Sequence, residues 1–345
     1  SHIHWGGGSP NVLHPEDIKR LSNVTRARFR IADGAEFAVE IDPRHLPVER
    51  VAAFAEAGVN RISFGVQDFN PQVQEAINRL QSFEITKAAA DAFRAHGVKA
   101  LNIDLVYGLP HQTTESVVET LHQVLALDPD RIAIFGYAHL PARLKHQRQI
   151  ADTALPDPMA RFEQSNRLAE MLIKEGYARI GLDHFARQED TLATKQINRN
   201  FQGYTTDAAD TLIGFGASAI GRLPQGFVQN AVLAPDYAQR IKADGLATAR
   251  GLELTAEDRV RGFVIERLMC DLEFPTAEVA RRFGTAAKPV LDEAEQIIAS
   301  DPDHLIERTA GGFRVTDRGR PFVRTIASRF DTYLSATKAT HSAGV

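Results

Sequence analysis

Short apolar runs alternate with longer amphipathic stretches over the first 140 residues of the chain. The runs are rich in β-branched side chains and are followed by Gly, Pro or polar residues, as buried parallel strands are. This pattern predicts five strands. They are expected at Ser1–Trp5, Phe37–Ile41, Arg61–Val66, Ala100–Val106 and Arg131–Tyr137.

Helical periods fill the intervals between these runs. Pro or acidic residues occur near their starts, and Gly58 and Gly97 follow two of their ends, which is typical of helix termini. Strands that alternate with helices predict a parallel sheet covered by helices. The expected helices are Pro15–Phe29, Pro47–Glu56, Thr86–Ala95 and Thr114–Leu125.

Polar residues recur at the ends of the expected strands. Glu40, Gln67, Asp104 and His139 lie at or just beyond the carboxyl ends. In a β/α barrel these ends form the rim of the active site. We therefore predict a closed or partly closed β/α barrel rather than a doubly wound sheet.

The second half of the chain has a different pattern. A helix is expected at Met159–Lys174 and one strand at Tyr177–Phe185, followed by polar and glycine-rich sequence. Beyond Leu252, three helices and two short strands follow in an order typical of winged-helix domains. They are Ala256–Cys270, Thr276–Phe283, Ala287–Ala299, Leu305–Glu307 and Gly312–Val315. We expect a barrel domain at 1–225, a helical domain at 226–335 and a disordered tail at 336–345.

Composition excludes several classes of protein. The 345 residues carry a net charge of −4, without the basic excess of a general nucleic-acid binder. No apolar run reaches the roughly 18 residues that a membrane span needs. The single cysteine, Cys270, cannot form an internal disulfide or ligate a multi-cysteine metal site. It lies within a helical pattern, which indicates a core residue.

The start of the chain offers two candidate features. Gly6, Gly7 and Gly8 follow the first strand, so they form either a tight turn or a loop whose backbone approaches a ligand. His2 and His4 lie on one face of that strand, as in the metal site of many barrel hydrolases. The later strand ends are poor in nitrogen ligands, which disfavours such a site. The alternative is that one histidine packs and the other is hydrogen-bonded.

Charged and amide side chains on the later strands suggest a polar ligand. Glu40 and Asp104 interrupt apolar runs, and a buried carboxylate costs free energy unless it meets a partner or a ligand. With Gln67 they could hold hydroxyl groups such as those of a ribose. Arg79 is either a solvated cation at a helix end or a clamp for a carboxylate.

Asp183 and His184 form a possible catalytic pair. Adjacent residues of one strand face opposite sides, so we do not expect these two side chains to orient each other.

Seven sequence strings in order resemble one family, from residue 1 to about Leu334. This is the oxygen-independent coproporphyrinogen III oxidase (coproporphyrinogen dehydrogenase) family of the radical S-adenosylmethionine superfamily. The strings are His4-Trp5-Gly6-Gly7-Gly8-Ser9-Pro10, Glu40-Ile41-Asp42-Pro43, Gly65-Val66-Gln67-Asp68-Phe69, Asn102-Ile103-Asp104-Leu105-Val106-Tyr107-Gly108-Leu109-Pro110, Tyr137-Ala138-His139-Leu140-Pro141, Asp183-His184-Phe185-Ala186-Arg187 and Arg199-Asn200-Phe201-Gln202-Gly203-Tyr204-Thr205-Thr206.

The resemblance implies a partial (β/α)₆ TIM-like barrel with a mostly helical C-terminal domain. It implies a cytoplasmic, monomeric enzyme of haem biosynthesis that takes electrons from an electron donor whose identity the sequence does not give. Two propionates of coproporphyrinogen III would be oxidatively decarboxylated to vinyl groups, giving protoporphyrinogen IX. The implied cofactors are S-adenosylmethionine and a [4Fe–4S] cluster held by a C-x₃-C-x₂-C loop. With one cysteine here, we expect that loop and the first barrel strand to precede Ser1. The 345 residues alone are then expected to be inactive.

The resemblance also implies a set of site residues. The family's cofactor-binding positions fall on Gly7, Gly8, Ser9, Glu40, Gln67, Arg79, Asp104, Ala138 and Ile220. Gln202 would border a second cofactor molecule, and Arg187, Arg199 and Lys195 are candidates to meet substrate propionates. Ser9 stands where the family usually has Thr, and Asn198 where it often has His. The implied alternatives are a haem-trafficking relative that binds porphyrin without decarboxylating it, and a barrel metal-dependent hydrolase.

Overall fold

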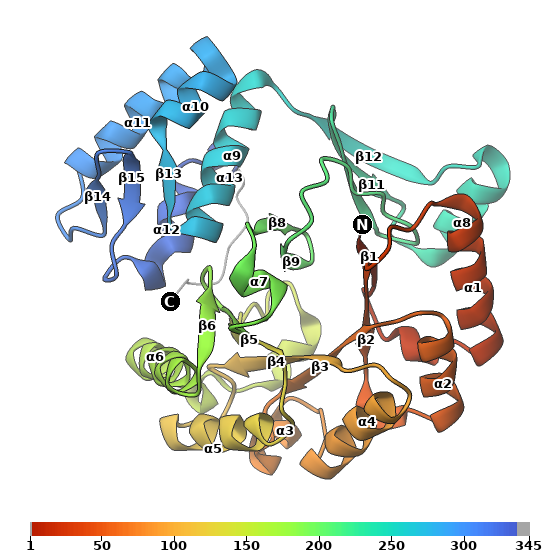
Figure 1. Cartoon of the computed structure of the whole chain (residues 1–345). Helices are drawn as coiled ribbons and strands as arrows, with labels where there is room; N and C mark the ends of the chain where they lie inside the picture. The colour runs from red at the N-terminus through yellow and green to blue at the C-terminus, as the bar shows by residue number, and fades with distance from the viewer. Residues whose placement is uncertain (1, 337–345) are drawn as a thin grey trace. The chain divides into compact units, whose positions relative to one another are not determined.

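The chain folds into two compact units, seen in a computed structural model that describes residues 2–336 (Figure 1). They meet in sequence at Thr194 and Lys195. The division at residue 225 that the sequence suggested stays a prediction, and most of the predicted tail, from 337 onward, lies outside the described residues. Within 2–336, no helix has both the length and the apolar character needed to cross a bilayer.

A seven-stranded sheet forms the centre of the first unit. Five strands run parallel, which confirms the predicted alternation of strands and helices, and the last two are antiparallel. The two edge strands are not hydrogen-bonded to each other, so the barrel is open. The sheet order is β1 (His2–Trp5), β2 (Glu36–Ile41), β3 (Arg61–Gln67), β4 (Ala100–Tyr107), β5 (Arg131–Gly136), β7 (His184–Arg187) and β6 (Tyr177–Ile180).

The single strand expected at Tyr177–Phe185 is wrong. The structure has two antiparallel strands there, β6 and β7, joined by a turn at residues 181–183. Gly181 adopts a φ of +55°, which permits the reversal. The apolar pattern continues through Ile180-Gly181-Leu182, so periodicity alone did not reveal the turn.

Helices cover one face of this sheet (Figure 1). Thr113 and Ser116 form a capping box that begins α5, and Ser82 caps α4 by accepting a bond from the Ile85 N–H. The helices of the first unit, including those outside this layer, are α1 (Pro15–Arg28), α2 (Val48–Glu56), α3 (Pro71–Ala76), α4 (Phe83–Ala95), α5 (Thr114–Leu125), α6 (Pro158–Lys174) and α7 (Thr191–Thr194), with short 3₁₀ turns η1 (Pro10–Val12), η2 (Pro43–His45), η3 (Lys145–Gln149) and η4 (Asp152–Ala154).

The two faces of the sheet differ in polarity. Along β2, β3 and β4 every second residue is buried, and these residues are apolar side chains that pack against the helices. The residues between them are less buried and are largely polar or small. The parallel register sets Glu40 beside Ser63, and Gly65 beside Asp104. The inner face therefore carries the polar side chains.

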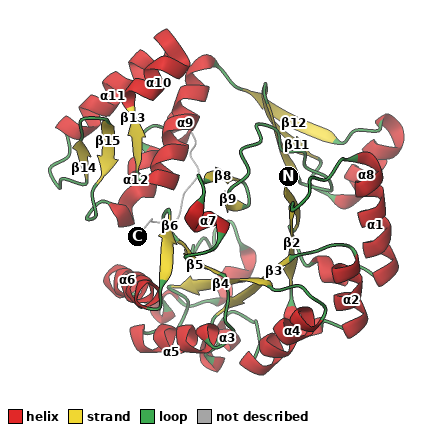
Figure 2. Cartoon of the chain, in the orientation of Figure 1, coloured by secondary structure: helices red, strands yellow, loops and turns green. Residues whose placement is uncertain are grey.

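The second unit combines small sheets with helices, drawn in Figure 2 by secondary structure. The predicted three helices followed by a hairpin are confirmed, and a third strand, β13, joins the hairpin. Phe274 of β13 stacks on Phe313 of β15 at 5.0 Å between ring centroids. The elements are β8 (Asn198–Asn200), β9 (Gly203–Thr205), β10 (Ile220–Leu223), β11 (Gly226–Asn230), α8 (Ala234–Asp244), β12 (Thr248–Glu253), α9 (Ala256–Asp271), β13 (Glu273–Pro275), α10 (Thr276–Phe283), η5 (Gly284–Ala286), α11 (Ala287–Ala299), β14 (Ile306–Arg308), β15 (Gly312–Val315), η6 (Arg320–Phe322), α12 (Val323–Ser328) and α13 (Thr332–Ala336).

Candidate active site

The glycine loop after β1 packs against side chains of the sheet. A Cβ built on Gly6 would lie 2.6 Å from the Glu40 carboxyl carbon and 2.6 Å from His4 Nε2. Only glycine leaves room for that contact. Gly7 has a φ of +80°, and its N–H donates to Glu40 Oε2 at 3.2 Å. The loop is thus fixed to β2, while a Cβ at Gly7 or Gly8 would meet no atom within 4 Å.

Glu40 lies one residue before the end of β2. Its Oε1 is 3.1 Å from His4 Nε2, and this hydrogen bond holds the pKa of Glu40 below its ordinary value. One of the two strand histidines is therefore hydrogen-bonded, as one interpretation of the sequence expected. Glu40 remains partly exposed and ionised, so it can attract a cation at this edge of the sheet.

Asn11 is a residue that sequence reasoning missed. Its buried amide donates to the Asp42 carbonyl at 2.9 Å, and its Oδ1 accepts from the Asp42 N–H at 3.0 Å. This pair of bonds joins η1 to the residues that follow β2. In sequence, Asn11 looks like an ordinary residue at a helix start, so only the fold shows its role.

Gln67 ends β3 at an irregularity in the sheet. The register between β3 and β4 shifts between Gly65 and Gln67, and Gln67 has a φ of +67°. Such a bulge redirects a side chain. A Cβ built on Gly65 would lie 2.7 Å from Gln67 Nε2, so the amide passes close over that glycine. The structure gives this amide no hydrogen-bond partner among residues 2–336, which leaves both its donor and acceptor for a ligand.

Arg79 is a half-buried cation that lies beside β3. Its Nη2 donates to the Gly65 carbonyl at 2.6 Å and to Gln81 Oε1 at 3.0 Å. Burial, and then the nearby Arg44, lower the pKa of Arg79, although a guanidinium stays charged. Its Nε is buried without a hydrogen-bond partner, and in the described part of the chain no carboxylate forms an ion pair with it. These features fit an anionic ligand such as a carboxylate.

Asp104 lies in the middle of β4, three residues before the strand ends at Tyr107, rather than at the strand end that we expected. The strand continues because Leu105 and Tyr107 still alternate into the helix-covered face. Asp104 accepts bonds from Asn102 Nδ2 at 3.0 Å and Ser63 Oγ at 3.3 Å. Burial raises the pKa of Asp104, and His184 opposes that shift.

Asp183 and His184 do orient each other, so the expectation from strand geometry is wrong. His184 Nδ1 lies 2.8 Å from Asp183 Oδ1. Asp183 belongs to the turn before β7, where the alternation of side chains does not apply. His184 is opposite Ala133 of β5, which in turn is beside Asp104.

The loop after β5 carries Ala138 and His139. Gln147 holds this loop, because its Nε2 donates to the Ala138 carbonyl at 2.9 Å and its Oε1 accepts from the Leu140 N–H at 2.5 Å. His139 Nε2 lies 3.1 Å from Asp152 Oδ1. Ser9 precedes η1, and its hydroxyl makes no capping bond there.

Most of the expected first-unit site residues share one edge of the sheet. They follow or end successive parallel strands, with Asp104 deeper on the inner face. The members are Gly7, Gly8, Ser9, Glu40, Gln67, Arg79 and Ala138. The structure does not bring Arg187 to this edge. Because β7 is antiparallel, Arg187 lies near the start of β5, where it pairs with Asp128.

Four further expected residues belong to the second unit, which begins with one of them, Lys195. Ile220 begins β10. Gln202 lies in the turn between β8 and β9, with its N–H bonded to Asn200 Oδ1 at 2.8 Å. The Arg199 guanidinium lies 5.6 Å from the centre of the Tyr204 ring. Asn198 is held within this unit, since its Oδ1 accepts from Arg267 at 3.2 Å.

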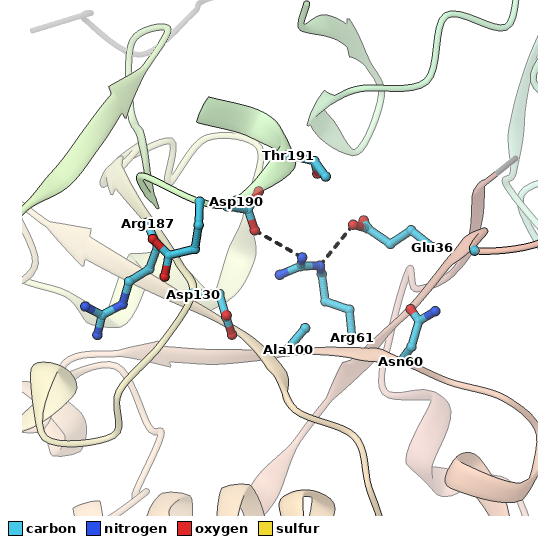
Figure 3. Close-up of a pocket in the computed structure, with 10 residues that line it drawn as sticks. Glu36, Asn60, Arg61, Ala100, Asp130, Arg187, Asp190 and Thr191 are labelled. Carbon is cyan, nitrogen blue, oxygen red and sulfur yellow. Dashed lines mark hydrogen bonds and ion pairs between the residues drawn. The ribbon is translucent and has the colours of Figure 1, made fainter. Parts of the chain in front are cut away.

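The amino-terminal edge of the sheet carries a cluster of charges that the sequence did not reveal. Figure 3 shows Arg61 between Glu36 and Asp190, at 3.1 Å and 3.2 Å. Arg131 contacts the same two carboxylates at 3.1 Å and 2.9 Å. A cavity of about 350 Å³ lies beside them. Since the charges satisfy one another at the strand starts, we interpret this charge cluster as structural.

The described residues contain no group of three or more His, Cys, Asp and Glu side chains that could hold a metal ion. Cys270 is buried in α9, and burial raises its pKa to about 12. It is therefore a protonated core residue at neutral pH.

Comparison with known proteins identifies two domain families in the chain. Residues 1–124 match the Radical SAM superfamily, and residues 254–322 match the HemN C-terminal domain. The first match contains β1 to β4 with most of the polar edge.

Curated relatives match nearly the whole chain. The oxygen-independent coproporphyrinogen III oxidase of Bradyrhizobium diazoefficiens is 46% identical over 100% of this chain and 77% of the relative. The protein of the same name from Paracoccus denitrificans is 44% identical over the same shares. That of Escherichia coli is 39% identical over 97% of this chain and 74% of the relative.

A solved structure agrees with these relatives. Coproporphyrinogen III oxidase (HemN) from Escherichia coli, described as a Radical SAM enzyme, superimposes with a TM-score of 0.91 at 38% identity. The match covers 96% of this chain and 78% of that one, which confirms the expected partial radical SAM barrel with its helical C-terminal region. The relatives' shared name favours the oxidase over the haem-trafficking and metal-hydrolase alternatives. The chain belongs to the oxygen-independent coproporphyrinogen III oxidase family of the Radical SAM superfamily.

Proposed function

We propose that the polar edge of the first unit binds S-adenosylmethionine and that, in the holoenzyme, this chain serves the oxidation of coproporphyrinogen III to protoporphyrinogen IX. The names of the relatives support the reaction. The observation that carries the cofactor site is Arg79, a half-buried cation with an unpartnered Nε and no ion pair among the described residues.

The two ends of a methionine group match the charges at this edge. The Arg79 guanidinium would bind the carboxylate, with geometry that guanidinium groups favour. Glu40 is held ionised by His4 and would attract the amine and the sulfonium. Gly7, Gly8 and the Ser9 hydroxyl would add backbone and side-chain polar groups beside them.

The nucleoside part would extend along the inner face. The free amide of Gln67 and the carboxylate of Asp104 suit ribose hydroxyls, because each can accept hydrogen bonds there. The backbone of Ala138, held by Gln147, would meet the adenine edge.

The chemistry itself belongs to the bound groups. A [4Fe–4S] cluster together with S-adenosylmethionine supplies the one-electron chemistry that removes a hydrogen atom from each reacting propionate. This chain holds one cysteine and therefore offers no set of cluster ligands. Its own residues bind and orient the cofactor, and the polar inner face keeps that cofactor at the strand ends.

For the remaining candidate residues we propose a region of the site and not a contact with a particular ligand atom. Gln202, Arg199 and Ile220 would border a second cofactor molecule or the substrate. Arg187 has less support, because its guanidinium already pairs with Asp128. We also propose a monomer that receives electrons from a separate electron donor. We place it in the cytoplasm, because that compartment keeps thiols reduced.

Binding measurements test the cofactor site directly. Titration calorimetry with S-adenosylmethionine should give saturable binding to the 345-residue chain. Glu40→Gln should weaken it about tenfold, because the charge that faces the amine is lost. Unchanged affinity in that variant would remove Glu40 from the site.

Product analysis tests the reaction. An anaerobic holoenzyme that contains this chain should convert coproporphyrinogen III to protoporphyrinogen IX, which chromatography separates after oxidation. Porphyrin binding without decarboxylation would instead indicate the haem-trafficking function.

A further inference from the structure

We propose that Gln81 is a positioning residue for the cofactor site, which holds the Arg79 guanidinium in the orientation that receives a carboxylate. The inference rests on the proposed function of Arg79. Gln81 itself is 1% exposed and lies behind Arg79, so it has no access to a ligand. It would act only through the arginine.

The hydrogen-bond network determines which way the Gln81 amide faces. Its Nε2 donates to Thr86 Oγ1 at 3.1 Å, and that hydroxyl donates its single proton to the Ser82 carbonyl at 3.0 Å. Thr86 therefore offers only an acceptor to Gln81. The amide nitrogen must face Thr86, and the amide oxygen must face Arg79.

A second glutamine fixes the backbone of Gln81. Gln74 Oε1 accepts from the Gln81 N–H at 2.9 Å, and Gln74 Nε2 donates to the Gln81 carbonyl at 2.6 Å. The Gln74 carbonyl also accepts from the Arg79 N–H at 2.8 Å. Gln74 is buried, so these bonds lie away from water. Gln81 is thus held at both its backbone and its side chain.

This arrangement orients the guanidinium without neutralising it. The Gly65 carbonyl and Gln81 Oε1 both bind Nη2, and two acceptors on one nitrogen fix the plane of the rigid group. Both acceptors are neutral, so the positive charge stays available. A carboxylate at position 81 would hold the same nitrogen but would compete with an anionic ligand for the charge.

The structure therefore predicts an effect on one part of the cofactor only. S-Adenosylhomocysteine carries the amino acid carboxylate, whereas 5′-methylthioadenosine lacks it. In the full chain, Gln81→Met should weaken binding of the first ligand about tenfold and change binding of the second less than twofold. A general loss of packing around the site would instead weaken binding of both ligands to the same extent.

Three further variants complete the test. Gln72→Met makes the same chemical change on the exposed side of α3 and should leave both affinities unchanged. Arg79→Met should reproduce the selective loss, and adding Gln81→Met to it should add nothing further. If Gln81→Met fails to fold, Gln81→Glu replaces it. The new carboxylate should also weaken binding of S-adenosylhomocysteine without weakening binding of 5′-methylthioadenosine.

The outcomes separate the two proposals. If the parent chain binds neither ligand, or if Arg79→Met affects both ligands equally, the cofactor site itself is wrong. If Arg79→Met is selective but the Gln81 variants are not, only the positioning role is overturned.

Discussion

Glu40 and Asp104 are carboxylates on the same inner face of the sheet, yet their surroundings shift their pKa values in opposite directions. The hydrogen bond from His4 lowers the pKa of Glu40, whereas burial raises that of Asp104. Glu40 is thus ionised throughout the neutral range. Burial disfavours the charged form of Asp104, so this carboxyl group costs the folded state free energy once the pH exceeds its unfolded pKa.

Replacing Asp104 should separate stability from binding. Because its pKa is raised in the folded state, the charged carboxylate destabilises the fold at any pH above the folded pKa. That penalty disappears below the unfolded pKa. Asp104→Asn should raise the melting temperature at pH 7 by roughly 2–4 °C, and the gain should vanish towards pH 4.

The same variant should bind S-adenosylmethionine more weakly at pH 7, measured by calorimetry. Melting curves at several pH values supply the stability part of the test. A lower melting temperature at pH 7, or a gain that persists at pH 4, would contradict the assigned cause.

Gly6 offers a second test at a single residue. Gly6→Ala should push the Glu40 carboxylate and the His4 ring apart, since the new methyl group would lie 2.6 Å from both. S-Adenosylmethionine affinity should fall about tenfold. Gly262→Ala is a matched control in α9, where a Cβ meets no atom within 4 Å, and it should leave the affinity unchanged.

At the level of whole elements, a helix or strand could be predicted from the sequence where the chain carries apolar periodicity or a capping motif. Helices α5, α10 and α11 begin and end where expected, because apolar periodicity runs through each of them and α5 also has a capping box at Thr113. Helix α3 has six residues and shows too little of a period to predict. Every residue of β12 is exposed, so it lacks the apolar alternation that predicts a strand.

The charge cluster at the amino-terminal edge should stabilise the sheet of the first unit without affecting cofactor binding. Arg131 joins the starts of β2 and β5 to Asp190. Without it, the Glu36 and Asp190 carboxylates share the single cation of Arg61, so one negative charge of the cluster is left uncompensated. Arg131→Met should lower the free energy of unfolding by about 3–5 kcal/mol. Denaturant titration measures this effect.

A surface pair provides the control for that variant. Lys87→Met breaks the exposed ion pair with Asp91 and should cost less than about 1 kcal/mol. Neither variant should change the affinity for S-adenosylmethionine while the chain is folded. Weaker binding in Arg131→Met would show that the two edges are coupled.

For the whole molecule, the sequence predicts which candidate residues share one edge of the sheet, but not the contacts that hold them there. Glu40, Gln67 and Arg79 were expected together because the carboxyl ends of parallel strands share one edge. Asn11 contacts Asp42, which the fold brings to it from a distant part of the chain. Gln81 contacts near neighbours in sequence, Gln74, Arg79 and Thr86, but their spacings do not together form a helical or strand period and so predict no contact. The motif that contains Arg187 predicts a place near the substrate, whereas the antiparallel direction of β7 puts Arg187 near the start of β5.

The cysteine count gives a prediction for the whole chain. Anaerobic reconstitution with iron and sulfide should leave the 345 residues without a [4Fe–4S] cluster and without decarboxylase activity, because Cys270 is a lone, buried, protonated thiol. Iron and sulfide analysis with the visible spectrum measures this. Stoichiometric iron, retained in Cys270→Ser, would contradict it.

The charge cluster of Glu36, Arg61, Arg131 and Asp190 also has a thermal consequence. The cost of removing charged groups from water falls as temperature rises, so ion-pair networks contribute more to stability in the heat. The stability lost in Arg131→Met should therefore be greater near the melting transition than at room temperature, when denaturant titration measures it at both. An equal or smaller loss in the heat would disprove this. The amino-terminal edge of the sheet is thus the part of the first unit whose contribution to stability grows on warming.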